Sequence, residues 1–265
     1  MNASPRPIFI GDTLQQPVES ALNGEYVSLL GETYYRIANF DAMPPFFISL
    51  VSGSNHWLFI ASTGGLSAGR VNSGQALFPY YTVDKLTENS ENTGAKAILL
   101  VERDGKTSLW EPFSPRQAGI YAVVRNLYKN VSGTALVFEE INNSLGLTYR
   151  YAWRSGDGFG FVKSGWLRND SAGDCRVEVL DGLQNLLPAN VGEQPQLTLS
   201  SLLDAYKRSE LEPLGLGIFT LNATMTDLAE PSESLLATTV WQVGLEAQHT
   251  LLSSRQLPAF RAGQG

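Results

Sequence analysis

The chain has little of what most catalytic or metal sites are built from. Its 265 residues include one cysteine, Cys175, and two histidines, His56 and His249. A single cysteine excludes an intramolecular disulfide, and no base stands near it in the sequence to activate a thiol. Neither histidine stands at helical spacing from another ligand-type residue, so the sequence predicts no metal site. We likewise expect no cofactor, because the glycine pairs do not form a phosphate-binding or dinucleotide fingerprint.

Long apolar runs and an excess of basic charge are also absent. No stretch of about 18 apolar residues occurs, and the N-terminal residues lack the apolar core of a signal peptide. The sequence therefore predicts a soluble cytoplasmic protein without a membrane partner. Nineteen basic residues against 26 acidic ones give a net charge of −7. Such a chain repels a phosphate backbone on average, so nucleic acid is not an expected partner.

Alternating strands dominate what is present, most clearly between residues 119 and 187. In residues 147–154, apolar and aromatic side chains occupy every second position, which is typical of a half-buried antiparallel strand. Short turns rich in Asn, Ser, Gly and Asp separate this strand from its neighbours, and Asp104-Gly105 marks a tight hairpin. We predict an all-β, mainly antiparallel fold, a large β-supersandwich that forms a single domain over residues 1–265.

Two further segments stand out from the strand pattern. Leu199, Leu202 and Leu203 recur at helical spacing, so we expect one short helical insertion near residues 199–211, ended by Pro213 and Gly215. Residues 78–94 interrupt the strands as a long connection, and loops of that length are often functional. A hairpin or bent strand is expected over residues 24–39, with its turn at Gly31-Glu32.

Catalytic arrangements are sparse. Glu139 and Glu140 are adjacent on a predicted strand, so they face opposite sides and do not form a cooperating pair. We interpret them as architectural, with an ion pair to Arg150 or Arg154 across the sheet. A Gly-x-Ser-x-Gly nucleophile motif does not occur, and we assign no catalytic residue.

Aromatic residues are the most numerous candidates for contacts with a ligand. Sugars present C–H faces that stack on aromatic rings, while their hydroxyl groups need polar partners. The long connection and the strands before it offer this mixture, although most aromatics of a β-sandwich belong to its core. The candidate carbohydrate contacts are Trp57, Arg70, Tyr80, Tyr81, Asp84 and Lys85. Arg70 and Asp84 are also candidates for an ion pair that holds the loop.

Several segments together resemble the N-terminal region of large bacterial proteins of the cellobiose-phosphorylase-like family. They include the Phe46-Phe-Ile-Ser-Leu-Val51 segment and Leu109-Trp-Glu-Pro-Phe113. The other segments that carry the resemblance are residues 56–60, 76–82 with 84–85, 136–140, 145–151, 181–188, 229–234 and 237–241. The resemblance implies a galactose-mutarotase-like β-supersandwich. In that family an (α/α)6 barrel follows and carries the catalytic acid and the phosphate site.

The resemblance also implies a function. This chain contains no such barrel, so we expect a non-catalytic N-terminal module that supports a downstream (α/α)6 catalytic domain and contacts carbohydrate. A second copy of the chain is a further candidate partner, as a homo-oligomer. Two alternatives are a mutarotase-like sugar epimerase, which needs a His and a Glu in one groove, and a stand-alone carbohydrate-binding module. Asp181 and Glu140 are the nearest candidates for the epimerase carboxylate.

Overall fold

A computed structural model of the chain describes residues 6–17, 21–158, 160–223 and 236–264. Strands joined by antiparallel pairing dominate it, and its helices are few and short. The all-β, mainly antiparallel prediction is therefore confirmed. Residues 229–234, which contribute to the family resemblance, lie outside the described residues.

The chain divides into two compact units, each built from two stretches of sequence. Unit 1 combines residues 1–54 and 97–181, and unit 2 combines residues 55–96 and 182–265. The amino-acid composition does not change sharply at any of the three boundaries, which is why the sequence predicts one domain. The two units are described separately.

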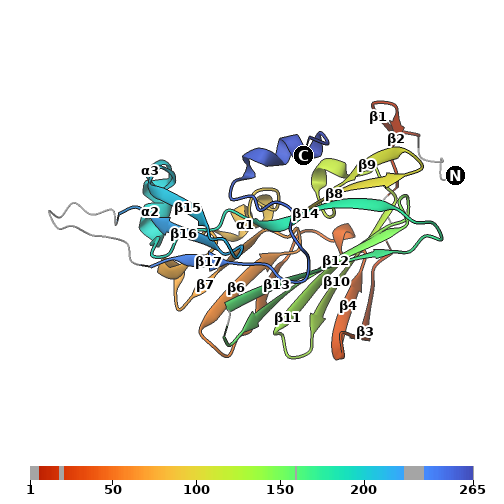
Figure 1. Cartoon of the computed structure of the whole chain (residues 1–265). Helices are drawn as coiled ribbons and strands as arrows, with labels where there is room; N and C mark the ends of the chain where they lie inside the picture. Colours follow the sequence, from red (N-terminus) through yellow and green to blue (C-terminus); the bar gives the residue numbers. More distant parts are fainter. Residues whose placement is uncertain (1–5, 18–20, 159, 224–235, 265) are drawn as a thin grey trace. The chain divides into compact units, whose positions relative to one another are not determined.

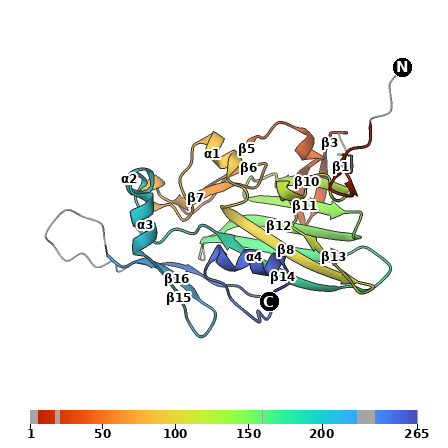
Figure 2. The same cartoon turned by 90° about the horizontal axis from the view of Figure 1, so that it is seen from above.

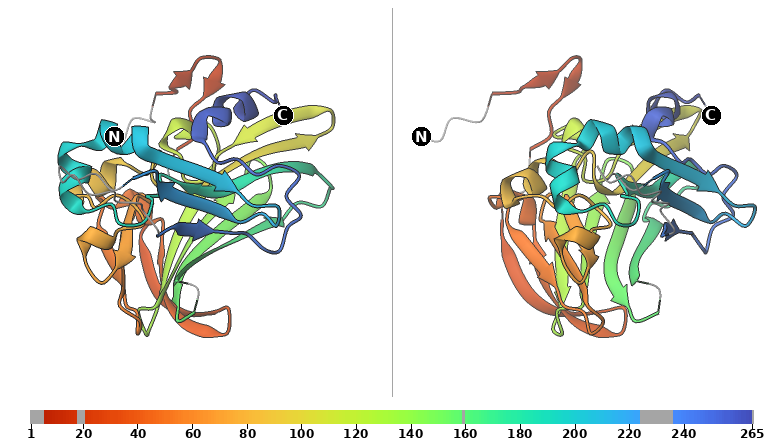
Figure 3. Two further views of the ribbon diagram at one scale, coloured as in Figure 1. Left: turned by 60° about the vertical axis from the view of Figure 1, so that its left-hand side comes forward. Right: turned by 90° about the vertical axis from the view of Figure 1, so that its left-hand side faces the viewer.

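Unit 1 is built on a six-stranded antiparallel sheet with the order β13-β12-β11-β10-β4-β3. Figure 3 follows this sheet from two directions, with β3 and β4 in red-orange and β11 to β13 in green. Its strands are β3 (Asn23–Leu29), β4 (Glu32–Ala38), β10 (Val123–Asn130), β11 (Ala135–Asn142), β12 (Leu147–Gly156) and β13 (Gly160–Asn169).

The remaining strands of unit 1 are shorter or lie in a second sheet. A three-stranded sheet has the order β14-β8-β9, and β8 and β14 lie in unit 1 for most of their length. The hairpin between β8 and β9 turns at Asp104 and Gly105, both with positive φ, as predicted. These strands are β1 (Phe9–Ile10), β2 (Thr13–Leu14), β5 (Phe47–Leu50), β8 (Gly94–Arg103), β9 (Lys106–Trp110) and β14 (Arg176–Gln184).

Contacts between the two sheets of unit 1 form a sandwich core. Trp110 on β9 donates its indole N–H to Glu140 on β11 at 2.7 Å. Tyr149 on β12 donates to Asp181 on β14, also at 2.7 Å. Glu140 stands opposite Tyr149, and in the next row of the same face the rings of Phe138 and Tyr151 stack with centroids 4.8 Å apart. The outer face of the six-stranded sheet is thus covered by the second sheet.

The inner face of the six-stranded sheet is also covered, because the sheet curls. Arg154 on β12 donates to Tyr34 at 2.6 Å and to Glu32 at 2.7 Å, both on β4. Two strands separate β12 from β4, which in a flat sheet would place them about 14 Å apart. Thr148 and Ala152, predicted on the open face of a half-buried strand, are 2% and 1% exposed. The half-buried prediction for this strand is therefore wrong at these positions.

Unit 2 consists of two smaller groups of strands and short helices. The hairpin β6 (His56–Ala61) and β7 (Leu66–Arg70) lies beside α1 (Val83–Glu88), as Figure 2 shows. Thr63 Oγ1 donates to the carbonyl of Thr87 at 2.8 Å and fixes α1 on this hairpin. The other elements are α2 (Glu193–Thr198), α3 (Ser200–Tyr206), β15 (Lys207–Leu211), β16 (Gly217–Leu221), β17 (Thr238–Val240) and α4 (Leu257–Arg261).

The single helix predicted near residues 199–211 is correct only in its first part. α3 ends at Tyr206, and residues 207–211 form β15, which pairs with β16 from Lys207 opposite Leu221 to Leu211 opposite Gly217. Pairing with a neighbouring strand outweighs the helical spacing there. Pro213 and Gly215 lie in the hairpin turn between these strands rather than after a helix. Helices α1, α2 and α4 are additional to the prediction.

Candidate functional site

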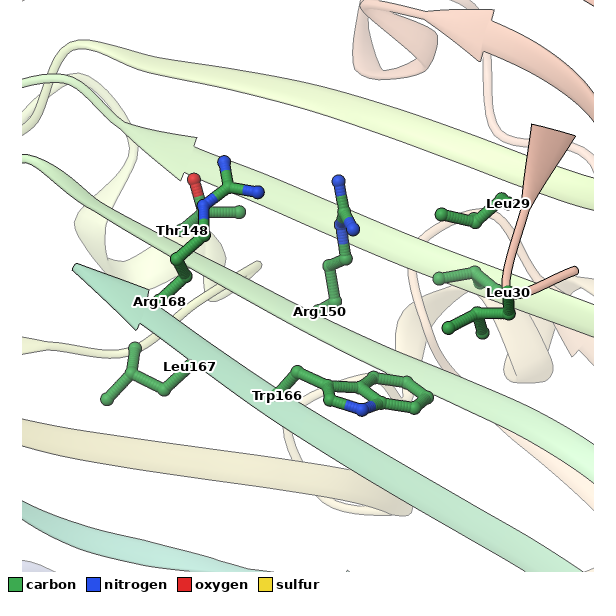
Figure 4. A pocket seen from close by; sticks show the side chains of 8 residues that line it. Leu29, Leu30, Thr148, Arg150, Trp166, Leu167 and Arg168 are labelled. Atoms are coloured by element: carbon green, nitrogen blue, oxygen red, sulfur yellow. The ribbon is translucent and has the colours of Figure 1, made fainter. Parts of the chain in front are cut away.

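A candidate site lies in unit 1, at a groove on the inner face of the curled sheet. Its volume is about 260 Å³. Residues of both edge strands, β3 and β13, line it together with residues of β11 and β12. We call it the inner groove, and Figure 4 shows its side chains. The lining residues are Leu29, Leu30, Val137, Thr148, Arg150, Trp166, Leu167 and Arg168.

A transverse row of the sheet places the central residues of the inner groove. Asn126 on β10 stands opposite Glu139 on β11, Glu139 opposite Arg150 on β12, and Arg150 opposite Trp166 on β13. Side chains that are directly opposite in an antiparallel sheet lie on the same face within about 5.5 Å at Cβ. The register alone therefore brings a carboxylate, a guanidinium and an indole into one line.

Glu139 anchors this row. Its carboxylate is 2% exposed, and Oε1 accepts hydrogen bonds from Asn126 Nδ2 and from the Tyr128 hydroxyl, each at 2.7 Å. Oε2 accepts a hydrogen bond from Arg150 Nε. Burial raises the pKa of Glu139, but these hydrogen bonds and the charge of Arg150 outweigh it and lower the pKa below its ordinary value. Glu139 is therefore ionised and holds Arg150 in one orientation.

A second ion pair lies one row along the sheet. Thr148 on β12 stands opposite Arg168 on β13. Arg168 Nε donates to Asp170 Oδ1, and the Thr148 hydroxyl donates to Asp170 Oδ2. The hydrogen bond from Arg168 is the largest cause of a lowered pKa at Asp170. Both arginines of the inner groove thus use Nε for a carboxylate.

Trp166 and two leucines give the groove its apolar side. The Trp166 side chain is 40% exposed, and Leu30 is 51% exposed. Leu30 and Gly31 form the two-residue turn between β3 and β4, one residue earlier than the predicted turn at Gly31-Glu32. Both turn residues have positive φ, 52° for Leu30 and 80° for Gly31. Leucine rarely adopts this conformation, for which Asn is usual at the first position.

The six residues predicted as carbohydrate contacts lie in unit 2. The structure brings Trp57 and Tyr80 together, with ring centroids 5.7 Å apart in an edge-to-face arrangement. Trp57 Nε1 donates to the carbonyl of Asn72 at 3.3 Å, and Gln196 Oε1 accepts the Tyr80 backbone N–H at 3.1 Å. Trp57 and Tyr80 are therefore tied to the local framework, and Tyr81 beside them is half-buried.

The charged candidates have local partners of their own. Asp84 lies in the first turn of α1, and a hydrogen bond from Thr82 is the largest cause of its lowered pKa. Lys85 pairs with Glu88 at 3.4 Å, one turn further along α1. Arg70 lies exposed at the end of β7, and in the described part of the chain it makes no ion pair with Asp84. The ion pair for which Arg70 and Asp84 were candidates is not formed, whereas the role of these six residues in carbohydrate contact stays a prediction.

Sequence reasoning missed Trp166, Arg168 and Thr148 as site residues. A signal was present, because Thr148-x-Arg150 and Trp166-x-Arg168 place a matching pair on one face of two successive strands. The predicted ion pair of the adjacent glutamates with Arg150 or Arg154 is confirmed for Glu139 and Arg150. The described residues contain no group of three His, Cys, Asp or Glu side chains that could hold a metal ion.

Comparisons with known proteins do not assign the chain to a family. No protein-family model matches the chain, and no curated protein sequence matches it. Among the described residues no helix is long and apolar enough to cross a membrane. The functional argument therefore depends on the geometry of the site.

Proposed function

We propose that the chain is a non-catalytic β-sandwich module of a carbohydrate-active protein and that it contacts saccharide through the inner groove. The observation that carries the proposal is the exposed indole of Trp166 directly opposite Arg150, whose orientation Glu139 fixes. An aromatic surface next to a few oriented polar groups is the usual composition of a small-molecule site. A sugar ring offers an apolar C–H face to the indole and polar substituents to the guanidinium groups.

The state of the carboxylates supports a binding role rather than catalysis. Cleavage of a glycosidic bond commonly uses two carboxyl groups, one of which keeps its proton through a raised pKa. At the inner groove the pKa values of both Glu139 and Asp170 are lowered. Both side chains are also engaged with arginine and with hydroxyl or amide donors. Neither carboxyl group is suited to act as a general acid.

Exposed apolar side chains in unit 2 support the second part of the proposal, that the module packs on a catalytic domain which this chain does not contain. Leu214 is 97% exposed and Val243 is 84% exposed, and Leu197 and Leu245 exceed two thirds. Large apolar side chains left this exposed are candidates for the contact with such a partner domain. The family resemblance, with its (α/α)6 barrel after a β-supersandwich, agrees with such a partner.

A saccharide titration followed by tryptophan fluorescence and by calorimetry tests the binding role. We expect one or more hexose-based sugars to bind the whole chain with a dissociation constant between micromolar and millimolar. Trp166→Ala should abolish this binding and leave the far-ultraviolet circular dichroism spectrum unchanged. Trp57→Ala is the matched control, because it removes an aromatic residue from the cluster in unit 2. Saccharide binding lost in Trp57→Ala but kept in Trp166→Ala would move the site to the residues predicted from sequence.

A further inference from the structure

The polar side chains of the inner groove offer hydrogen-bond donors and almost no acceptors. Arg150 and Arg168 each use Nε for a carboxylate. Within the described part of the chain, the terminal nitrogens of these two guanidinium groups donate to no other residue. Trp166 adds an indole N–H. Each arginine therefore keeps its pair of terminal nitrogens, which matches the two oxygens of a carboxylate or a phosphoryl group.

The acceptors near the groove are largely engaged by the protein itself. Glu139 is 2% exposed and accepts three hydrogen bonds, two on Oε1 and one on Oε2. Asp170 accepts one on each oxygen, from Arg168 and from Thr148. The Thr148 hydroxyl donates its hydrogen to Asp170, and the residue is 2% exposed. Asp170, whose side chain is 31% exposed, keeps one lone-pair position on each oxygen, so the acceptors open to a ligand are few beside the donors.

This inventory discriminates between classes of saccharide. A neutral sugar presents hydroxyl groups, each of which brings a donor as well as acceptors, so a site with many donors and few acceptors pairs the hydroxyl hydrogens poorly. A carboxylate, sulfate or phosphate group brings acceptors only. Leu29, Leu30 and Trp166 on the other side of the groove suit the apolar face of the ring that carries such a group.

We propose that the inner groove binds an acidic saccharide, with the anionic group on the terminal nitrogens of Arg150 and Arg168 and the sugar ring against Trp166. This inference rests on the proposed carbohydrate-binding function and narrows it to one ligand class. Glu139 and Asp170 balance the positive charges of the two arginines, so the site has little net charge to attract an anion from a distance. Selectivity therefore comes from short, oriented hydrogen bonds. The net charge of −7 also means that the whole chain does not attract anions.

Four ligands tested on the whole chain by calorimetry decide the ligand class. They are glucuronate, glucose 6-phosphate, glucose and inorganic phosphate. We expect one of the two acidic sugars to bind at least tenfold more tightly than both glucose and inorganic phosphate. Which acidic sugar it is tells a carboxylate ligand from a phosphoryl ligand. Arg168→Lys keeps the charge but loses the pair of terminal nitrogens, and it should weaken binding of the preferred sugar about tenfold.

The other outcomes separate this inference from the function on which it rests. Glucose that binds as tightly as the acidic sugars, with loss of binding in Trp166→Ala, would overturn the acidic class and keep the carbohydrate role. Inorganic phosphate that binds as tightly as glucose 6-phosphate would reduce the site to an anion site without a sugar. If no saccharide binds, the proposed function itself fails. Arg176→Lys, an exposed arginine on β14, is the control and should bind like the wild type.

Discussion

The carboxylates of Glu139 and Glu140 lie on opposite faces of β11 and complete two separate networks. Glu139 orients Arg150 at the inner groove. Glu140 accepts the Trp110 indole N–H and the Phe113 backbone N–H, each at 2.7 Å, and pairs with Arg125 at 2.8 Å. The connection after β9 is thereby fixed on the outer face, with Phe113 held at a φ of 64°. Strand alternation thus assigns one carboxylate to a candidate binding site and its neighbour to the sandwich core.

Glu139→Gln is expected to lower the free energy of unfolding by about 2–3 kcal/mol, because a buried, charge-assisted network loses its charge. The amide also turns an NH₂ group toward donors such as Asn126 and Arg150. Urea denaturation followed by circular dichroism measures the loss. Glu178→Gln is the matched control, because this exposed carboxylate lies 3.6 Å from Arg176, and it should change stability by less than about 1 kcal/mol. Equal losses in the two variants would contradict a special role for Glu139.

The lowered pKa of Glu139 predicts how stability depends on pH. The folded-state pKa lies below the ordinary value of 4.5, so Glu139 stabilises the fold fully above that value. This contribution is lost as the pH falls through the folded-state pKa. Urea denaturation at a series of pH values between about 5 and 3 should show a shallower loss of stability for Glu139→Gln than for the wild type.

Asp41 has a pKa shift opposite in sign to that of Glu139, so the same pH series tests it in the other direction. Burial raises the pKa of Asp41 above its ordinary value of 3.8, although Arg125 opposes the shift. A carboxyl group with a raised pKa favours the folded state at low pH, and this contribution is lost as the pH rises through the folded-state pKa. Asp41→Asn removes it, so the variant should lose stability more steeply on acidification than the wild type. A shallower loss would mean that Arg125, rather than burial, dominates at this carboxyl group.

Local signals in the sequence predict the strands but not the curvature of the sheet. The Asp104-Gly105 turn and the antiparallel strands from β10 to β13 follow from turn chemistry and alternation. The burial of Ala152 does not, because it depends on the curl that brings Tyr34 of β4 into the same cluster. The Thr148 side chain is engaged by Asp170, which lies just after β13. The same limit applies to Trp166. Its place beside Arg150 is set by the register between β12 and β13, and its place in one groove with Leu30 by the approach of the two sheet edges.

Helices were the less predictable part for a related reason. Residues 207–211 continue a helical spacing, but pairing with β16 turns them into a strand. α1 has six residues, fewer than an isolated helix needs, and it is stabilised by its contact with the β6–β7 hairpin. Tertiary contacts therefore determine the structure of both segments. The spacing of apolar residues along the sequence does not predict such contacts.

Gly65→Ala tests the contact between α1 and the β6–β7 hairpin. A Cβ atom at Gly65 would lie 2.0 Å from the carbonyl oxygen of Leu86, a backbone atom of α1 that has no flexible side chain to move aside. We expect thermal unfolding to show a loss of about 3 kcal/mol, the upper range for overpacking. Gly182→Ala is the control, because its Cβ meets no atom within 4 Å. Unchanged stability in Gly65→Ala would show that α1 does not rest on this hairpin.

Leu30→Asn is expected to stabilise the chain while it weakens saccharide binding. Leu30 has a φ of 52°, a conformation that costs most L-residues about 1–2 kcal/mol and that Asn adopts more readily. We therefore expect the free energy of unfolding to rise by about 1 kcal/mol. The apolar contact that Leu30 offers in the inner groove is lost at the same time, so binding should weaken several-fold in calorimetry. Leu22→Asn, at a similarly exposed leucine outside the groove, should change neither quantity in this direction. A gain in stability with unchanged binding would remove Leu30 from the ligand contact and leave Trp166 as the apolar platform.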